Sequence, residues 1–318
     1  MRLLLVVLLL VLVRPAHAAE QRCADAEDRK PYDGPLFDAM AQIESTMSGN
    51  VTKALDEQGI ARMALFARVH PKRSAESSVL WLKRRYGERL VLGTPKAFDQ
   101  RDDLSDGFVD RTLSFLRDER YRFVGEILFA HADKTHGEQT PDGERYVAPE
   151  GRNVQRLLAA LEARKTPLMF HWEVYDWERD WPAFDRLFSR FPGVTFIWTH
   201  AGHGSAEQVR SVVSSHANVI VTLSKEEKYQ RAFSSQEKAS TLGGPLIDRC
   251  GRVLPEWREL IERYPDRFMF ATDAHKDFRW AVYPDIVKRW RDILGQFPEP
   301  LARSLASGNA EQIYGVPR

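Results

Sequence analysis

Four ionisable residues stand at or near the ends of apolar stretches, where they could act together in chemistry. His171 ends the run in FHWE, His200 ends the run in IWTHAGHG, and Asp273 ends the run in FATDAHKD. Glu126 lies inside a fourth run, VGEIL. Imidazole and carboxylate groups are the usual ligands of Zn²⁺, and a water bound to that ion can reach a pKa of about 7. The same groups could transfer protons directly, or each could be an ordinary hydrogen-bonded residue at a strand end.

These residues can meet only if the runs that carry them lie side by side. Eight short apolar runs recur along the chain, and most are continuous rather than alternating, which is typical of strands buried on both faces of a parallel sheet. Amphipathic helical segments separate them. We therefore predict an α/β fold, a single (β/α)₈ TIM barrel with its active site at the C-terminal ends of the strands. The predicted strands are 35–41, 61–67, 89–94, 123–130, 167–172, 194–201, 218–223 and 267–274. The predicted helices between and after them are 51–59, 78–87, 108–120, 153–165, 181–193, 206–216 and 255–266.

The alternative architecture is an open, doubly wound sheet. It lacks support, because no glycine-rich phosphate turn follows the early strands. Two polar, turn-rich insertions, 131–151 and 225–254, follow the fourth and seventh predicted strands. Both would emerge at the C-terminal face of a barrel, as substrate loops or as plain surface insertions.

The first residues of the chain have the features of a secretory signal peptide. Arg2 is followed by an apolar stretch from Leu3 to Val13, and Ala16-His17-Ala18 forms a small-x-small cleavage site. The apolar stretch is shorter than the roughly 20 residues that a membrane span needs. We expect a signal peptide at 1–18, a TIM-barrel domain at 19–318, and a periplasmic or secreted protein without a membrane association after cleavage.

The composition points to a small-molecule substrate rather than a nucleic acid. The formal net charge is +1, and the sequence contains no basic stripe of the kind that binds nucleic acid. The two cysteines, Cys23 and Cys250, could form a disulfide in an oxidising compartment, but the sequence does not place them within bridging distance. The substrate and the oligomeric state cannot be read from the sequence.

Several segments together resemble one protein family. The segments FHWE, THAGHG and ATDA, the opening YDGPLFDA and the closing GNAEQIYGV resemble, in this order along the chain, the amidohydrolase-related family of TIM-barrel metal-dependent hydrolases and decarboxylases. The resemblance implies that His171 and His200 are the histidines of the fifth and sixth strands. It also implies that Asp273 is the eighth-strand carboxylate, which in the family binds metal and acts as a general base.

The first strand departs from the family pattern. The family ends this strand with Asp-x-His-x-His, whereas this chain has Asp38 followed by Met40 and Gln42. A thioether and an amide are poor ligands for Zn²⁺ beside imidazole. Because strand side chains alternate, Met40 and Gln42 should point to the same side, which we expect to be the barrel interior.

Three hypotheses follow from this departure. In the first, Zn²⁺ or Mn²⁺ is held by His171 and His200 with a carboxylate from Glu126 or Asp273. In the second, no metal is bound, and Asp273 and His200 carry out acid–base catalysis directly. In the third, the barrel is catalytically inactive and serves as a small-molecule binding or structural protein. We expect the enzyme, a hydrolase that attacks a small molecule through an activated water; decarboxylation is not excluded.

Other residues near the predicted strand ends have two possible roles each. The aromatic cluster at 171–181 could pack on the barrel or form a wall that stacks a substrate. Lys96, Lys225 and Lys276 could hold a substrate carboxylate, but lysines are mostly exposed, so solvated surface charges are expected.

Overall fold

A computed structural model describes residues 23, 30–44, 46–70, 73–97, 104–131, 145–224 and 245–317. The predicted signal peptide at 1–18, Lys225 and large parts of the two polar insertions lie outside the described residues. Among the described residues, no helix combines the length and the hydropathy of a membrane span.

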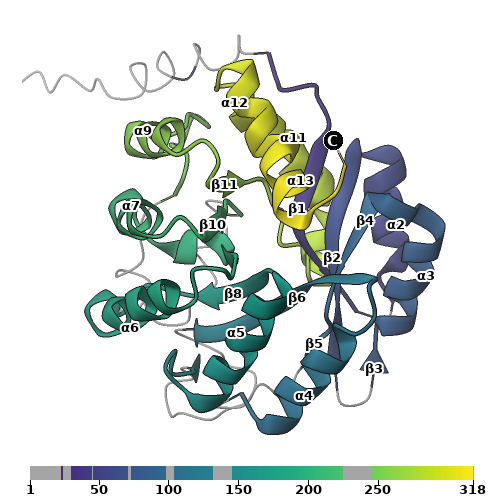
Figure 1. The fold of residues 1–318 in the computed structure, drawn as a ribbon. Helices are drawn as coiled ribbons and strands as arrows, with labels where there is room; N and C mark the ends of the chain where they lie inside the picture. The colour runs from purple at the N-terminus through teal and green to yellow at the C-terminus, as the bar shows by residue number, and fades with distance from the viewer. Residues whose placement is uncertain are drawn as a thin grey trace, which may run out of the picture.

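Eight parallel strands form the centre of the molecule, and all eight predicted strands are confirmed with shifted ends (Figure 1). Backbone hydrogen bonds close the sheet into a barrel: the amide of Ala39 donates to the carbonyl of Phe270 at 3.1 Å, and that of Gln42 to the carbonyl of Ala274 at 2.7 Å. The fold is therefore the predicted (β/α)₈ TIM barrel. In order of pairing, the strands are β1 (Leu36–Ile43), β2 (Ile60–His70), β4 (Leu90–Gly93), β6 (Tyr121–His131), β8 (Leu168–Trp172), β9 (Phe196–Trp198), β10 (Val219–Thr222) and β11 (Phe268–Met269). The short strands β3 (Arg73–Ser74), β5 (Lys96–Ala97) and β7 (Arg145–Tyr146) pair outside this order.

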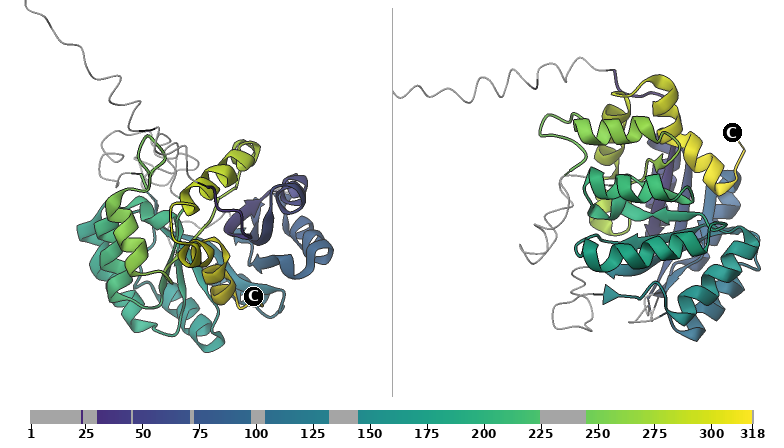
Figure 2. Two further views of the ribbon diagram at one scale, coloured as in Figure 1. Left: turned by 90° about the horizontal axis from the view of Figure 1, so that it is seen from above. Right: turned by 60° about the vertical axis from the view of Figure 1, so that its left-hand side comes forward.

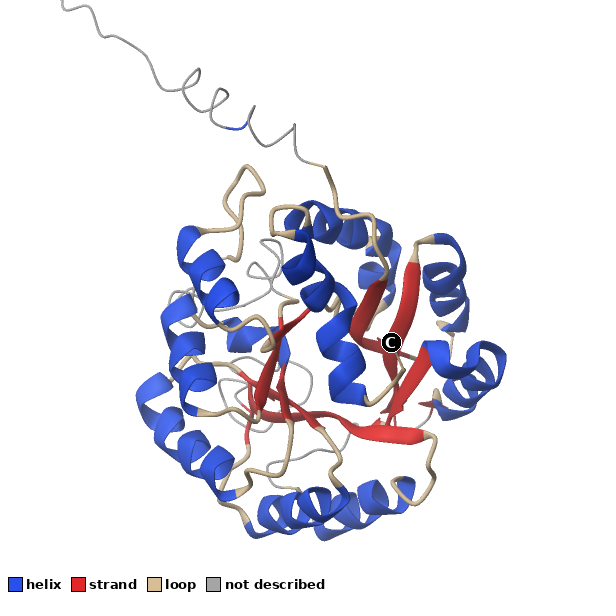
Figure 3. Cartoon of the chain, turned by 45° about the horizontal axis from the view of Figure 1, so that its top comes forward, coloured by secondary structure: helices blue, strands red, loops and turns tan. Residues whose placement is uncertain are grey.

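The helices lie outside the ring of strands, as Figures 2 and 3 show. The seven predicted helices are present as α2 (Ser48–Glu57), α3 (Glu76–Tyr86), α4 (Asp106–Phe115), α5 (Arg152–Arg164), α6 (Trp177–Arg190), α7 (Ala206–Ser215) and α9 (Pro255–Arg263). The family-like closing segment forms α13 (Asn309–Tyr314). Three further helices were not predicted from the sequence: α10 (Asp277–Ala281), α11 (Tyr283–Leu294) and α12 (Glu299–Arg303).

The buried side chains form two separate hydrophobic clusters. The larger one lies between the strands and the helices, and it holds most of the residues on the inner faces of the helices. The smaller one, which we call the inner cluster, takes residues from each of the eight strands and from the C-terminal segment. Tyr314 of α13 belongs to it; its ring stacks on Phe37, and its hydroxyl donates to the carbonyl of Ala39. The barrel is thus a packed core, as TIM barrels are.

Two β-bulges decide which side chains face the barrel interior. In β1, the pairing with β2 advances three residues from Asp38 to Ala41 against two residues on β2. In β6, the pairing with β8 advances three residues from Val124 to Ile127 against two on β8. An extra residue reverses the alternation of side chains along a strand. These bulges turn Met40, Gln42 and Glu126 inward.

Two of the predicted strands end several residues earlier than expected, and one of them, predicted at 267–274, ends at Met269. The strand predicted at 194–201 ends at Trp198, and Thr199–His203 forms a tight turn, η2. Within it, His200, Ala201 and Gly202 have φ of 57°, 50° and 58°. Positive φ is uncommon outside glycine, so the alternating strand geometry cannot continue through this segment.

The aromatic cluster packs on the outside of the barrel. The ring of Trp172 stacks on Trp177, Trp198 and Phe184, at centroid distances of 5.6, 5.0 and 4.1 Å. Its indole N–H donates to the buried carboxylate of Asp180 on α6 at 3.1 Å. Trp172 therefore packs on the barrel and does not form a wall for a substrate; its side chain is buried between β8 and α6.

Candidate functional site

Three of the predicted site residues converge at the C-terminal ends of the strands. Nδ1 of His171 on β8 lies 3.1 Å from Oε1 of Glu126 on β6. Nε2 of His200, in the turn after β9, lies 3.6 Å from the same oxygen. All three side chains are buried, and they form a group that could hold a metal ion.

Asp273 joins this group from the opposite edge of the barrel. Its Oδ2 lies 3.7 Å from Nε2 of His200 and 3.3 Å from Nδ1 of His275. Asp273 has a φ of 50°, and its backbone amide donates to the carbonyl of Met40 on β1 at 3.0 Å. Strained backbone at a non-glycine residue persists where surrounding contacts hold it, and this one directs the carboxylate toward His200.

Each of the two histidines has a partner on its second ring nitrogen. Nε2 of His171 lies 3.0 Å from Oε1 of the buried Glu173, and Nδ1 of His200 lies 2.7 Å from the hydroxyl of Ser224. Such contacts fix the orientation and the tautomer of a ligating imidazole. They leave Nδ1 of His171 and Nε2 of His200 facing Glu126.

The negative charge of Glu126 and the positive charge of His171 stabilise each other. Burial alone would raise the pKa of Glu126, but Lys96 and the hydrogen bonds from His171 and His200 hold it well below its usual range. Burial alone would lower the pKa of His171, but its hydrogen bonds to Glu126 and Glu173 raise that pKa to about 9. In the absence of metal, Glu126 is therefore a carboxylate and His171 an imidazolium at neutral pH.

Asp273 and Glu173 are also held as carboxylates. Burial opposes the charge of each, but His275 and His200 hold the pKa of Asp273 well below its usual range. His131 and His171 do the same for the pKa of Glu173. Three buried carboxylates thus face one cluster of imidazoles.

Lys96 and Gln42 take part in this network in a way that the sequence alone did not indicate. Lys96 is not a solvated surface charge: its ammonium forms a buried ion pair with Oε2 of Glu126. Gln42 donates from Nε2 to Oδ1 of Asp273 at 3.2 Å and to Oε2 of Glu126 at 3.4 Å. Arg68 donates to Oε1 of Gln42 at 2.9 Å. Their positions near predicted strand ends were the only sequence signal for these residues.

The donor set fits a divalent metal ion. Around a tetrahedral ion with bonds of roughly 2.0–2.1 Å, donor atoms lie about 3.3 Å apart. Oε1 of Glu126 lies 3.1 Å from Nδ1 of His171 and 3.6 Å from Nε2 of His200, close to that value, and the donor atoms of these three residues all lie within 4.8 Å of one another. Oδ2 of Asp273 lies 3.7 Å from Nε2 of His200, at the edge of this group. The partners Glu173 and Ser224 supply the supporting contacts that metal-binding histidines have. Metal binding at His171 must displace a proton, because only the neutral imidazole ligates.

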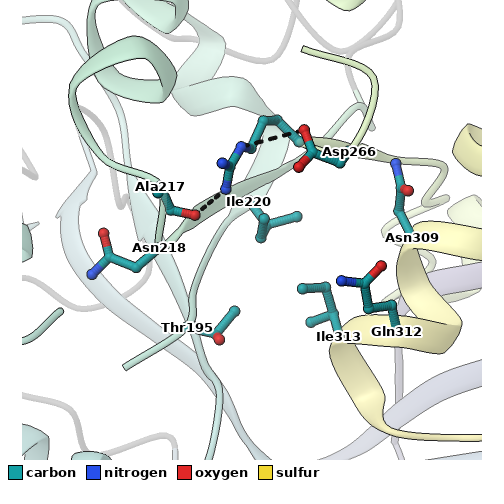
Figure 4. Close-up of a pocket in the computed structure, with 9 residues that line it drawn as sticks. Thr195, Ala217, Asn218, Ile220, Asp266, Asn309, Gln312 and Ile313 are labelled. Carbon is teal, nitrogen blue, oxygen red and sulfur yellow. Dashed lines mark hydrogen bonds and ion pairs between the residues drawn. The ribbon is translucent and has the colours of Figure 1, made fainter. Parts of the chain in front are cut away.

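A cavity of about 140 Å³ lies away from this site. It opens between the segments that precede β9, β10 and β11 and the C-terminal helix, with Thr195, Asp266 and Asn309 around it (Figure 4). These positions are at the N-terminal ends of the strands, whereas the ionisable cluster is at their C-terminal ends. We therefore place the candidate active site at the ionisable side chains Glu126, His171, His200 and Asp273.

Comparison with known proteins identifies the fold and the family. The family described as Amidohydrolase (Amidohydro_2) matches residues 106–316, a range that begins after β1 and does not include Met40 and Gln42. None of the curated proteins matches this chain.

Solved structures of this kind share the fold at low sequence identity. A probable 2-pyrone-4,6-dicarboxylic acid hydrolase from Acinetobacter baumannii, with citric acid bound, is 13% identical, with a TM-score of 0.55, over 88% of this chain and 99% of that one. An amidohydrolase from Burkholderia multivorans with bound zinc is 13% identical, with a TM-score of 0.52, over 89% and 100%. 2,6-Dihydroxybenzoate decarboxylase from Rhizobium is 12% identical, with a TM-score of 0.50, over 89% and 99%.

Proposed function

The chain belongs to the amidohydrolase family, and from that premise we propose that it is a periplasmic or secreted hydrolase that attacks a small molecule through an activated water. One observation carries the proposal: donor atoms of Glu126, His171, His200 and Asp273 converge at the end of the barrel where TIM-barrel enzymes have their active sites. Export is proposed from the signal-like residues 1–18.

The metal site of this proposal is atypical, because the resemblance places Met40 and Gln42 at the positions of the family's two first-strand histidines. His171 and His200 would hold Zn²⁺ or Mn²⁺ together with a carboxylate oxygen of Glu126 or Asp273. The ion would supply Lewis acidity and lower the pKa of a coordinated water toward about 7.

In this proposal Asp273 accepts the proton of the attacking water and returns it to the leaving group. Its lowered pKa makes it a weak base toward ordinary water. It therefore depends on a more acidic water, which is the chemistry that a metal provides. His275, whose Nδ1 lies 3.3 Å from Oδ2 of Asp273, favours the charged form of this carboxylate.

Replacing Asp273 tests the proposed base. Asp273→Asn keeps the size of the side chain and removes its basicity, so hydrolysis should fall about 10²–10⁴-fold. The assay measures acid release from a panel of small lactones, esters and amides, with the full mature chain. Asp277→Asn, at an exposed position on α10, is the matched control and should hydrolyse like the parent.

Two results would count against the proposal. Equal rates for the parent and Asp273→Asn would remove Asp273 from catalysis. A folded parent chain that turns over none of the panel, yet binds its members, would favour the inactive binding barrel.

A further inference from the structure

The carboxylate of Glu126 has different partners on its two oxygens. Oε1 faces imidazole nitrogens, 3.1 Å from Nδ1 of His171 and 3.6 Å from Nε2 of His200. Oε2 faces hydrogen donors, since it pairs with the ammonium of Lys96 and accepts from Nε2 of Gln42 at 3.4 Å. Glu126 therefore lies between two chemically different halves of the site.

Asp273 is divided in the same way. Its Oδ2 lies 3.7 Å from Nε2 of His200, whereas its Oδ1 accepts a hydrogen bond from Nε2 of Gln42 at 3.2 Å. Both carboxylates thus present one oxygen to the histidine half and the other oxygen to a half that contains Lys96 and Gln42.

The orientation of Gln42 is fixed by Arg68. The guanidinium of Arg68 donates to Oε1 of Gln42 at 2.9 Å, so the amide nitrogen has to face the two carboxylates. A guanidinium and an ammonium have no lone pair to offer a metal ion, and an amide nitrogen is not a metal donor either. This half of the site is therefore lined by groups that repel a cation rather than bind one.

We propose that the Lys96 ammonium is a built-in cation that takes the place of a second metal ion. The inference rests on the proposed function, because it assigns one metal to the histidine half and Lys96 to the other. The Glu126 carboxylate would bridge the metal and the ammonium. Since the side chains of Lys96 and Glu126 are only 10% and 4% exposed, solvent screens their attraction little. The site is then limited to one metal ion per chain.

Converting the Lys96 half into a ligand set tests this assignment. The triple variant Met40→His, Gln42→His, Lys96→Met removes the ammonium and adds two inward-facing imidazoles to β1. We expect it to bind one Mn²⁺ more per chain than the parent, as measured by equilibrium dialysis. If both ions are bound, electron paramagnetic resonance should show a spin-coupled pair, where the parent shows an isolated ion.

Two further variants separate the ammonium from the imidazoles. Met40→His with Gln42→His keeps Lys96 and should bind no more Mn²⁺ than the parent. Lys53→Met, at an exposed position on α2, is the matched control for loss of a lysine and should also match the parent.

The outcomes distinguish this inference from the proposed function. If the parent binds no metal, the proposed metal site is wrong; a gain of one ion in the triple variant would still support the role of Lys96.

If the parent binds two ions, the proposed role of Lys96 is wrong. The same conclusion follows if the Met40→His, Gln42→His variant binds more ions than the parent while Lys96 is present. If the triple variant does not fold by circular dichroism, Lys96→Met alone decides: we expect it to lose at least about tenfold in hydrolysis at unchanged metal stoichiometry, and parent-like hydrolysis would overturn the inference.

Discussion

At the scale of single residues, the proposed site joins side chains that lie far apart in the sequence. His171, His200 and Asp273 could be found because they stand directly at the ends of apolar runs. Lys96 and Gln42 could not be assigned, because 30 and 84 residues separate them from Glu126 along the chain. Only the closed barrel brings them to the same carboxylate.

Asp38 is a buried carboxylate outside the proposed chemistry, and it ties β1 to the segment after β11. It accepts hydrogen bonds from the hydroxyls of Thr272 at 2.6 Å and Tyr283 at 2.9 Å, and from the backbone amides of Met40 and Thr272. Burial raises its pKa to about 6 even though these hydrogen bonds favour the charged form. Through these hydrogen bonds Asp38 holds the β1 bulge next to Asp273. Keeping its buried carboxyl group ionised lowers the stability of the folded state.

The stability of the protein should depend on pH through Asp38. The folded-state pKa of about 6 lies above the ordinary value of 3.8, so the folded state binds the proton more tightly. Protonation of Asp38 therefore stabilises the folded state. This stabilisation is fully present below about pH 4 and is lost as the pH rises through about 6, by about 3 kcal/mol in total. The difference in unfolding free energy between the parent and Asp38→Asn, from urea titrations between pH 4 and 8, should fall over that range and then stay constant. Asp292→Asn, exposed on α11, is the control; a parent curve parallel to that of Asp38→Asn would show that Asp38 does not titrate as described.

At the scale of elements, the alternation of apolar strands and amphipathic helices was sufficient to predict the barrel. The bulges were not predictable, because one inserted residue does not change the hydrophobic pattern of a continuous apolar run. Yet the β6 bulge decides that Glu126 faces inward, since Val124 and Ile127 both belong to the larger hydrophobic cluster between the strands and the helices. The turn after β9 was also missed, because THAGH continues a run of buried residues.

Gly202 should be required for that turn. It has a φ of +58°, and a Cβ added there would lie 2.3 Å from the Trp198 ring and 2.6 Å from the carbonyl oxygen of Trp172. Gly202→Ala should therefore lower the free energy of unfolding by about 2–4 kcal/mol and reduce hydrolysis, because the turn carries His200. The control is Gly49→Ala on α2, where a Cβ would have open space. Thermal unfolding of both variants provides the test, and equal stability would contradict the turn geometry.

At the scale of the whole molecule, one covalent link connects the N-terminal segment to the chain beyond β10. Cys23 and Cys250 form a disulfide with a Cα–Cα distance of 5.2 Å. The sequence could not establish this pairing, because 227 residues separate the two cysteines. Disulfides of this kind persist in oxidising compartments, which agrees with the proposed export.

Export predicts a defined N-terminus for the mature chain. Cleavage after Ala18 should leave Ala19 as the first residue. Mass spectrometry of the exported protein should show this N-terminus, and Cys23 and Cys250 should resist alkylation until they are reduced. A chain that retains Met1 would indicate a membrane anchor instead of a cleaved signal peptide.

Metal content tests the central claim most directly, namely that His171 and His200 hold one metal ion together with a carboxylate of Glu126 or Asp273. The mature chain, purified and dialysed after exposure to Zn²⁺ or Mn²⁺, should retain about one ion per chain by elemental analysis. His171→Ala removes one ligand and should retain clearly less than the parent. His216→Ala removes a histidine that pairs with Asp185 at the other end of the barrel and should retain as much as the parent. A parent chain without metal, or a His171→Ala chain with the same metal content as the parent, would contradict the account.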